Sequence, residues 1–147
     1  AVVEGIGDHG CEYMTGGRVA ILGPTGRNFG AGMSGGIAYV IDPDGSFKSK
    51  FDHSTADLLN VVPSSDDERE LKGMIEQHQR YTGSKLAARL LEDWGESLIQ
   101  FKKVFPKDYA QVLRDRIASQ ISNAAKNEAN KGLSGTPGRK EGIGSRG

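Results

Sequence analysis

The sequence carries Met14-Thr15-Gly16-Gly17-Arg18-Val19-Ala20-Ile21-Leu22 and repeats it as Met33-Ser34-Gly35-Gly36-Ile37-Ala38-Tyr39-Val40-Ile41. The step from position 14 to position 33 is 19 residues, and the same step joins Gly7 to Gly26. A repeat of about 20 residues with one apolar strand is typical of a solenoid, in which equivalent strands stack about 4.8 Å apart. We therefore expect a mainly β fold: an incomplete right-handed single-stranded parallel β-helix, with its coils in residues 1–63.

Glycine supports this interpretation through its uneven distribution. The chain has 21 glycines among 147 residues, about twice the average share. Residues 1–45 hold 12 of them, residues 46–131 hold three, and residues 132–147 hold six. Glycine suits the corners of a stack, because it accepts a positive φ and a close approach of neighbouring backbone. A solenoid needs at least about three repeats and capped ends, so we infer that earlier coils or a partner surface cover the first strand.

Residues 64–121 show the apolar spacing of a short helical tail. Ser65 and Glu68 have the form of a capping box, and Thr82-Gly83-Ser84 interrupts the helical pattern. The expected inward-facing positions of the helices are Leu71, Met74, Ile75, His78, Leu86, Leu90, Trp94, Leu98, Phe101, Val104, Tyr109, Val112, Leu113, Ile117 and Ile121. Residues 122–147 lack apolar periodicity, which predicts a disordered tail or an interdomain linker.

The overall composition argues against several classes of protein. The 19 basic and 19 acidic residues cancel, so no net charge draws the chain toward nucleic acid or an anionic membrane. Cys11 is the only cysteine, which rules out an internal disulfide and suits a reducing compartment. No apolar run approaches the ~20 residues that cross a bilayer.

Two segments match the dinucleotide-binding pattern of three spaced glycines: Gly5-Ile6-Gly7-Asp8-His9-Gly10 and Gly30-Ala31-Gly32-Met33-Ser34-Gly35. That pattern holds a pyrophosphate only where it follows a strand and opens a helix. The second segment leads into an apolar strand, and the first leads into a short glycine-bound turn. We therefore interpret both segments as corners of the stack.

No residue type in this chain stands in a pattern that indicates catalysis or metal binding. Cys11 lies two positions from His9, but a nucleophilic thiolate needs a base that a third group orients. His53 and His78 show no ligand spacing with Cys11. The acidic run Asp66-Asp67-Glu68-Arg69-Glu70 is explained by the positive end of a helix. We therefore assign no catalytic, cofactor-binding or metal-binding residue.

Several segments together resemble the C-terminal GXGXG region of the large, glutamine-dependent subunit of glutamate synthase. They are Gly7-Asp8-His9-Gly10-Cys11-Glu12-Tyr13-Met14-Thr15-Gly16-Gly17, Gly26-Arg27-Asn28-Phe29, Ala31-Gly32-Met33-Ser34-Gly35-Gly36-Ile37-Ala38-Tyr39-Val40, Gln77-His78-Gln79-Arg80 and Lys103-Val104-Phe105-Pro106-Lys107-Asp108-Tyr109. The resemblance covers about residues 1–117. The variant that the chain most resembles is the eukaryotic pyridine-nucleotide-dependent type, in which the glutamine-dependent part is fused to a reducing part.

The resemblance implies ammonia assimilation and glutamate biosynthesis: glutamine, 2-oxoglutarate and reductant give two glutamates. FMN, an iron–sulfur cluster, and FAD with NAD(P)H are implied for other domains of an oligomeric enzyme, and no cofactor for this segment. The segment itself resembles a structural spacer that packs against the glutaminase, FMN synthase and reducing parts. An intracellular location follows, in the cytoplasm or in a plastid or other organelle.

A second reading is a β-helix subunit or scaffold of another redox complex, like that of the formylmethanofuran dehydrogenase family. The helical tail with Phe105-Pro106-Lys107-Asp108-Tyr109 argues against it. A third class, a small nucleotide-binding enzyme, fails on the context of both glycine segments.

Overall fold

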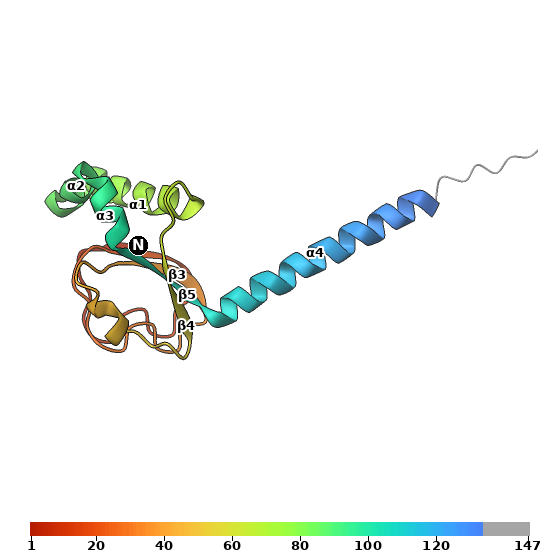
Figure 1. The fold of residues 1–147 in the computed structure, drawn as a ribbon, viewed down its shortest axis with the longest axis horizontal. Helices are drawn as coiled ribbons and strands as arrows, with labels where there is room; N and C mark the ends of the chain where they lie inside the picture. The colour runs from red at the N-terminus through yellow and green to blue at the C-terminus, as the bar shows by residue number, and fades with distance from the viewer. Residues whose placement is uncertain (134–147) are drawn as a thin grey trace, which may run out of the picture. The chain divides into compact units, whose positions relative to one another are not determined.

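The computed structural model describes residues 1–133, which form a sheet and several helices (Figure 1). Two compact units divide the chain, Ala1–Gln111 and Val112–Gly147, and the sheet lies in the first. The strands are β1 (Val2–Val3), β2 (Thr15–Ile21), β3 (Gly35–Ile41), β4 (Ala56–Asn60) and β5 (Phe101–Pro106). The helices are α1 (Asp66–Thr82), α2 (Lys85–Glu92), α3 (Trp94–Gln100) and α4 (Lys107–Leu133), with a short 3₁₀ helix η1 (Ser46–Ser49).

The sheet is mixed. Its strand order is β1-β2-β3-β5-β4, in which β1, β2 and β3 pair in parallel while β5 pairs antiparallel with both β3 and β4. The expected parallel strands are therefore present. The expectation of a mainly β chain is corrected, because the helices hold more of the described residues than the strands do. The fold of the described residues is a sheet combined with helices.

The 19-residue step of the sequence repeat is also the step between paired residues of β2 and β3. Val19 pairs with Ala38, and Ile21 pairs with Val40, each at the step found in the sequence. Strand β1 joins β2 at a step of 18 residues, with Val2 opposite Ala20. We call residues 4–22 the first repeat and residues 23–41 the second repeat.

Backbone conformation follows the same step. His9 and Asn28 have φ of 67° and 58°, and Gly17 and Gly36 have φ of 85° and 80°. The left-handed residues Cys11 and Tyr13 likewise correspond to Gly30 and Gly32. These left-handed positions of the first repeat therefore recur in the second, with the same residue at Gly17 and Gly36 and a different residue at the other three pairs.

The bends also stack on one another through backbone hydrogen bonds. Ile6 N–H donates to the Pro24 carbonyl at 2.9 Å, and Tyr13 N–H donates to the Ala31 carbonyl at 2.9 Å. A further layer follows, because Phe29 N–H donates to the Lys50 carbonyl at 2.9 Å. In Figure 1 these loops follow one another around a common interior.

Glycine is required where one repeat lies directly on the one before. A Cβ added to Gly35 would lie 2.1 Å from the carbonyl oxygen of Thr15, which is backbone of the first repeat. A Cβ added to Gly26 would lie 2.3 Å from the Asp8 carboxylate and 2.5 Å from its backbone nitrogen. No side chain fits at either distance, so hydrogen-bonded stacking excludes every residue but glycine there.

Both faces of the central strands are buried, which explains their continuous apolar sequence. One face contributes Ile21, Ala38 and Val40 to a core inside the loops, where the Phe29 and Phe47 rings meet edge to face at 5.0 Å. The opposite face packs under α1, α2 and α3. Together the sheet and these helices form a second core, and its buried residues are Ala20, Leu22, Ile37, Tyr39, Val61, Leu71, Ile75, Ala87, Leu98 and Phe101.

The expected continuation of the helix through Phe101 and Val104 is wrong, because both residues lie in strand β5. The two residues are three apart, a spacing that fits a helix, yet they belong to the cores on opposite faces of the sheet. The edge of β3 and the strand β4 offer backbone partners on both sides of this segment. Residues 46–63 begin with η1 before they reach β4.

The predicted helix boundaries hold for α1 and α2. The Ser65 hydroxyl accepts from Glu68 N–H at 3.3 Å, and the Glu68 carboxylate accepts from Ser64 N–H. Gly83, at φ 68°, ends α1 in the left-handed conformation. Ser84 then caps α2 by accepting from Ala87 N–H at 3.0 Å.

Residues 122–133, expected as part of a disordered tail or an interdomain linker, continue helix α4 to Leu133. Ala124, Ala125, Lys126, Glu128 and Ala129 are strong helix formers, which promote a helix without an apolar stripe. The remainder of that expectation, residues 134–147, lies outside the described residues.

Replacing Gly35 tests the close approach between repeats. We expect Gly35→Ala to lower the free energy of unfolding by about 1–3 kcal/mol, because the new Cβ overlaps the Thr15 carbonyl. Gly16→Ala is the matched control at the equivalent position of the first repeat. No described atom lies within 4 Å of a Cβ at Gly16, so we expect a change within about 0.5 kcal/mol. Urea denaturation followed by circular dichroism measures both variants, and equal losses would contradict the stacking account.

Candidate functional site

The residues singled out for chemistry in the sequence lie apart in the structure. Cys11 is half-buried against the core inside the loops, and burial raises the pKa of its thiol. His9 is exposed beside Glu12, with Nδ1 and Oε1 3.8 Å apart. A ring nitrogen of His53 lies 2.8 Å from the Lys48 carbonyl. Within residues 1–133, no three His, Cys, Asp or Glu side chains come close enough together to hold a metal ion.

Neither glycine-rich segment lies before a helix. Residues 30–35 lead into β3, and residues 5–10 lead through a turn into β2. Their backbone is engaged with the neighbouring layer, since Gly30 N–H donates to the Gly10 carbonyl at 2.9 Å. The helix N-terminus that a bound pyrophosphate needs is therefore not part of either segment.

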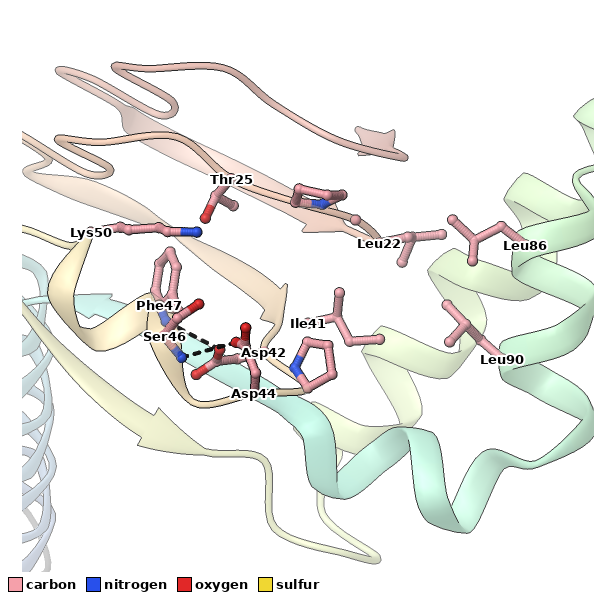
Figure 2. Close-up of a pocket in the computed structure, with 13 residues that line it drawn as sticks. Leu22, Thr25, Ile41, Asp42, Asp44, Ser46, Phe47, Lys50, Leu86 and Leu90 are labelled. Atoms are coloured by element: carbon pink, nitrogen blue, oxygen red, sulfur yellow. Dashed lines mark hydrogen bonds between the residues drawn. The ribbon is translucent and has the colours of Figure 1, made fainter.

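The candidate site is a cavity of about 310 Å³ at the carboxyl ends of β2 and β3 (Figure 2). Its apolar side is formed by Leu22 and Ile41 of the sheet, which face Leu86 and Leu90 of α2. Thr25, Asp42, Asp44, Ser46 and Lys50 contribute the polar side.

The two carboxylates of this cavity already hold the turn that leads into η1. Asp42 is 8% exposed, and its Oδ1 accepts from Phe47 N–H at 3.1 Å. Asp44 Oδ1 accepts from Ser46 N–H at 3.0 Å, and this bonding to Ser46 lowers the pKa of the Asp44 carboxyl. Local structure therefore accounts for both acids. The cavity therefore combines an apolar wall with two carboxylates that accept hydrogen bonds from the local turn.

Sequence reasoning placed Leu86 and Leu90 on one helix face but did not anticipate this cavity. Its walls come from segments far apart in the chain, since Leu86 lies 45 residues after Ile41 and 64 residues after Leu22. Only the packing of α2 beside the sheet brings them together. No local signal in the sequence predicts that contact.

A charged pair links the two repeats at their equivalent corners. Asp8 Oδ1 accepts from Arg27 N–H at 2.7 Å, and Asp8 Oδ2 lies 3.3 Å from the Arg27 guanidinium. The backbone N–H of Arg27, and then its side chain, lower the pKa of the Asp8 carboxyl. The pair is exposed, so its contribution is to orient the corner more than to stabilise the core.

None of the helices within residues 1–133 combines the length and the apolar character that a bilayer crossing requires.

The structure thus defines the class of protein. It is a sheet built from sequence repeats that bend at glycines, and the sheet packs between an internal core and a layer of helices. Comparison with known proteins gives the family. Residues 1–107 match the family model described as GXGXG motif. The chain belongs to the GXGXG motif family, and the resemblance to this region of glutamate synthase is confirmed.

Several similar proteins carry the name glutamate synthase. The chain is 52% identical over 120 residues to glutamate synthase [NADH] of Schizosaccharomyces pombe, covering 82% of this chain and 6% of that protein. It is 52% identical over 116 residues to the glutamate synthase [NADPH] large chain of Bacillus subtilis, covering 76% of this chain and 7% of that one. A chloroplastic ferredoxin-dependent glutamate synthase 2 of Arabidopsis thaliana is 44% identical over 106 residues, covering 72% and 6%. The chain thus spans 6–7% of these relatives' length.

Acid titration of an Asp8→Asn variant tests the corner pair. The folded protein holds the Asp8 pKa below its ordinary value, so the pair stabilises the fold above about pH 4 and loses this effect as the pH falls through the lowered pKa. We expect Asp8→Asn to be less stable than the parent chain at pH 7. The gap should close as the pH falls below about 4, as measured by urea denaturation at stepped pH. A gap that stays constant down to about pH 2.5 would show that the charge plays no part.

Proposed function

We propose that this chain forms the C-terminal coils of a longer right-handed parallel β-helix in a glutamate synthase. On this proposal the coils occupy residues 1–63, helical segments follow in residues 64–121, and a linker begins near residue 122. The chain spaces and packs against the glutaminase, FMN synthase and reducing parts of the same enzyme, and it catalyses no step itself.

The observation that carries the proposal is a difference between equivalent glycines. In the second repeat, Gly35 would meet the Thr15 carbonyl and Gly36 would meet backbone of Gly16 at 2.8 Å if either carried a Cβ. The equivalent Gly16 and Gly17 of the first repeat have no described atom within 4 Å. The first repeat therefore carries the glycines that a stacked neighbour requires, on the side where the described residues provide none.

The other end of the sheet supports a terminal position. Each step from β1 to β3 is parallel, whereas β5 pairs antiparallel with β3 and ends the parallel series. The last strand in space, β4, carries the exposed Asp57, and Asn60 at its end accepts from Lys102 Nζ of β5 at 2.7 Å. Charged side chains along an edge strand discourage further pairing. Growth of the stack is therefore favoured at β1 and opposed at β4.

The complete enzyme, on this proposal, converts glutamine and 2-oxoglutarate to two glutamates and serves ammonia assimilation. NADH or NADPH is the reductant, in keeping with the names of two relatives. FMN, the iron–sulfur cluster and FAD belong to other domains, and the full enzyme is oligomeric. It acts inside the cell, in the cytoplasm or in a plastid or other organelle.

A scaffold in another redox complex, such as one like formylmethanofuran dehydrogenase, is the second candidate. The matches to glutamate synthases extend over 72–82% of this chain, so they necessarily include α1, α2 and α3. They favour the first candidate.

A comparison of Gly16→Ala in two contexts tests the proposal. In the isolated chain, the new Cβ at position 16 meets no described atom, so the free energy of unfolding stays within about 0.5 kcal/mol of the parent's. In the complete glutamate synthase polypeptide, we expect an earlier coil to meet the new Cβ at a cost of about 1–3 kcal/mol. Urea unfolding of each form, followed by hydrogen exchange in β2, measures the difference.

Gly73→Ala is the matched control for that comparison. Gly73 lies inside α1 with no described atom within 4 Å of a Cβ, and alanine favours a helix. It should leave both forms as stable as the parent or slightly more so. A Gly16→Ala variant that is equally harmless in the complete polypeptide would overturn the proposal.

A further inference from the structure

The cavity beside α2 has an apolar wall that the described residues leave partly open. Ile41, Leu86 and Leu90 are each half-buried, and they pack against the edge of the core that lies under the helices. Leu22, the residue after β2, is 2% exposed and completes the wall. Figure 2 shows Leu22 and Ile41 on one side of the cavity and the two leucines of α2 on the other. The wall therefore offers a short aliphatic group a place out of water.

Each of the two carboxylates of this cavity has one oxygen that the local turn does not use. Asp42 and Asp44 hold the turn through Oδ1, by accepting from the N–H groups of Phe47 and Ser46. No hydrogen bond within residues 1–133 reaches the Oδ2 atom of either aspartate. An ionised carboxylate accepts up to about four hydrogen bonds, so both groups retain the capacity to bind a cation. Hydrogen bonding to Ser46 lowers the pKa of Asp44, which keeps this carboxyl charged at neutral pH.

Lys50 brings the opposite charge to the same cavity. Its side chain is half-buried and lies with Thr25 on the side of the cavity away from Leu86 and Leu90 (Figure 2). The Lys50 ammonium forms no hydrogen bond or ion pair with the described residues 1–133. Its attraction for the Asp44 carboxylate only adds to the causes that lower the pKa of that group. The cavity therefore holds a cation that is available to a ligand.

The two kinds of charge restrict the ligands that fit. An alkylammonium ion would pair with the carboxylates, but it would leave the Lys50 ammonium unpaired beside a second positive charge. An aliphatic acid would pair with Lys50 and would be repelled by both aspartates. A zwitterion with an aliphatic group satisfies all of these groups. The volume of about 310 Å³ is at the lower end of the range for small-molecule sites, which suits a single amino acid.

We propose that this cavity binds a free α-amino acid with a branched aliphatic side chain, such as leucine. The ammonium group of the ligand lies against the two aspartates. Its carboxylate binds Lys50 and the Thr25 hydroxyl, and its side chain packs on Leu86 and Leu90. The ligand thereby joins the end of β3 and the residues around η1 to α2. This inference goes beyond the proposed function and does not depend on it.

Isothermal titration calorimetry with L-leucine tests the site in a longer polypeptide that carries this sequence. Two analogues separate the charges, because 4-methylpentanoate lacks the ammonium group of leucine and isopentylamine lacks its carboxylate. We expect each analogue to bind on the order of tenfold more weakly than leucine, since each leaves a charged group of the cavity unpaired. Equal binding of leucine and either analogue would overturn the proposal.

Lys50→Met and Asp44→Asn each remove one charge and keep the local structure, since asparagine retains an oxygen that accepts from the turn. Each substitution should raise the Kd for leucine on the order of tenfold. The matched controls are Lys48→Met, which removes an equal charge from η1 outside the cavity, and Asp52→Asn. Asp52 holds a similar turn, because its Oδ1 accepts from Ser54 N–H at 3.0 Å, and it does not line the cavity. Both controls should bind leucine as the parent does.

Weaker leucine binding in both charge variants, with both controls unchanged, would support the site. Binding that neither charge variant weakens would place leucine elsewhere on the polypeptide and overturn the inference. Absence of binding at millimolar leucine would overturn it as well, and a segment of the polypeptide that fills the cavity would give that result. Melting temperatures without ligand check that each variant is folded. The two analogues probe the unsubstituted protein, so they decide the question even where a variant does not fold.

Discussion

The close approach of the second repeat to the first is the constraint on which the rest of the structure depends. Backbone hydrogen bonding holds stacked strands about 4.8 Å apart. At Gly35 that spacing leaves only 2.1 Å between a Cβ and the Thr15 carbonyl, so a side chain there would force the layers apart. The register of Ala20 with Tyr39 follows, and with it the alignment of the residues that face the two cores.

The stacked strands are stable only because both of their faces are covered. Inside the loops, Phe29 and Phe47 fill the space that the bends enclose. Outside, Asp67 and Glu70 of α1 contact side chains of β5, β3 and β2. Burial together with Asp67 and Glu70 raises the pKa of Tyr39, which keeps its hydroxyl a donor. Strand β5 then ends the parallel series by turning antiparallel against β3. The chain thus combines a repeat that favours addition of layers with a strand that stops it at one end.

Much of this could be predicted from the sequence, where the signals are local or periodic. The 19-residue step predicted the pairing of Val19 with Ala38, and Ser65 and Gly83 marked the ends of α1. The strand β5 could not be predicted, because the spacing of Phe101 and Val104 fits a helix and only the free edge of β3 decides between the two. The extent of α4 depends on helix propensity, and the cavity beside α2 depends on contacts between distant segments, neither of which the repeat encodes.

The most direct test of the stacking at β1 is a high-resolution structure of a longer polypeptide that carries this sequence. If the proposed function is right, a parallel strand lies about 4.8 Å from β1, with its backbone against Gly16 as Thr15 lies against Gly35. A structure in which β1 is a bare edge, or in which a helix or an antiparallel strand lies beside it, would contradict the account.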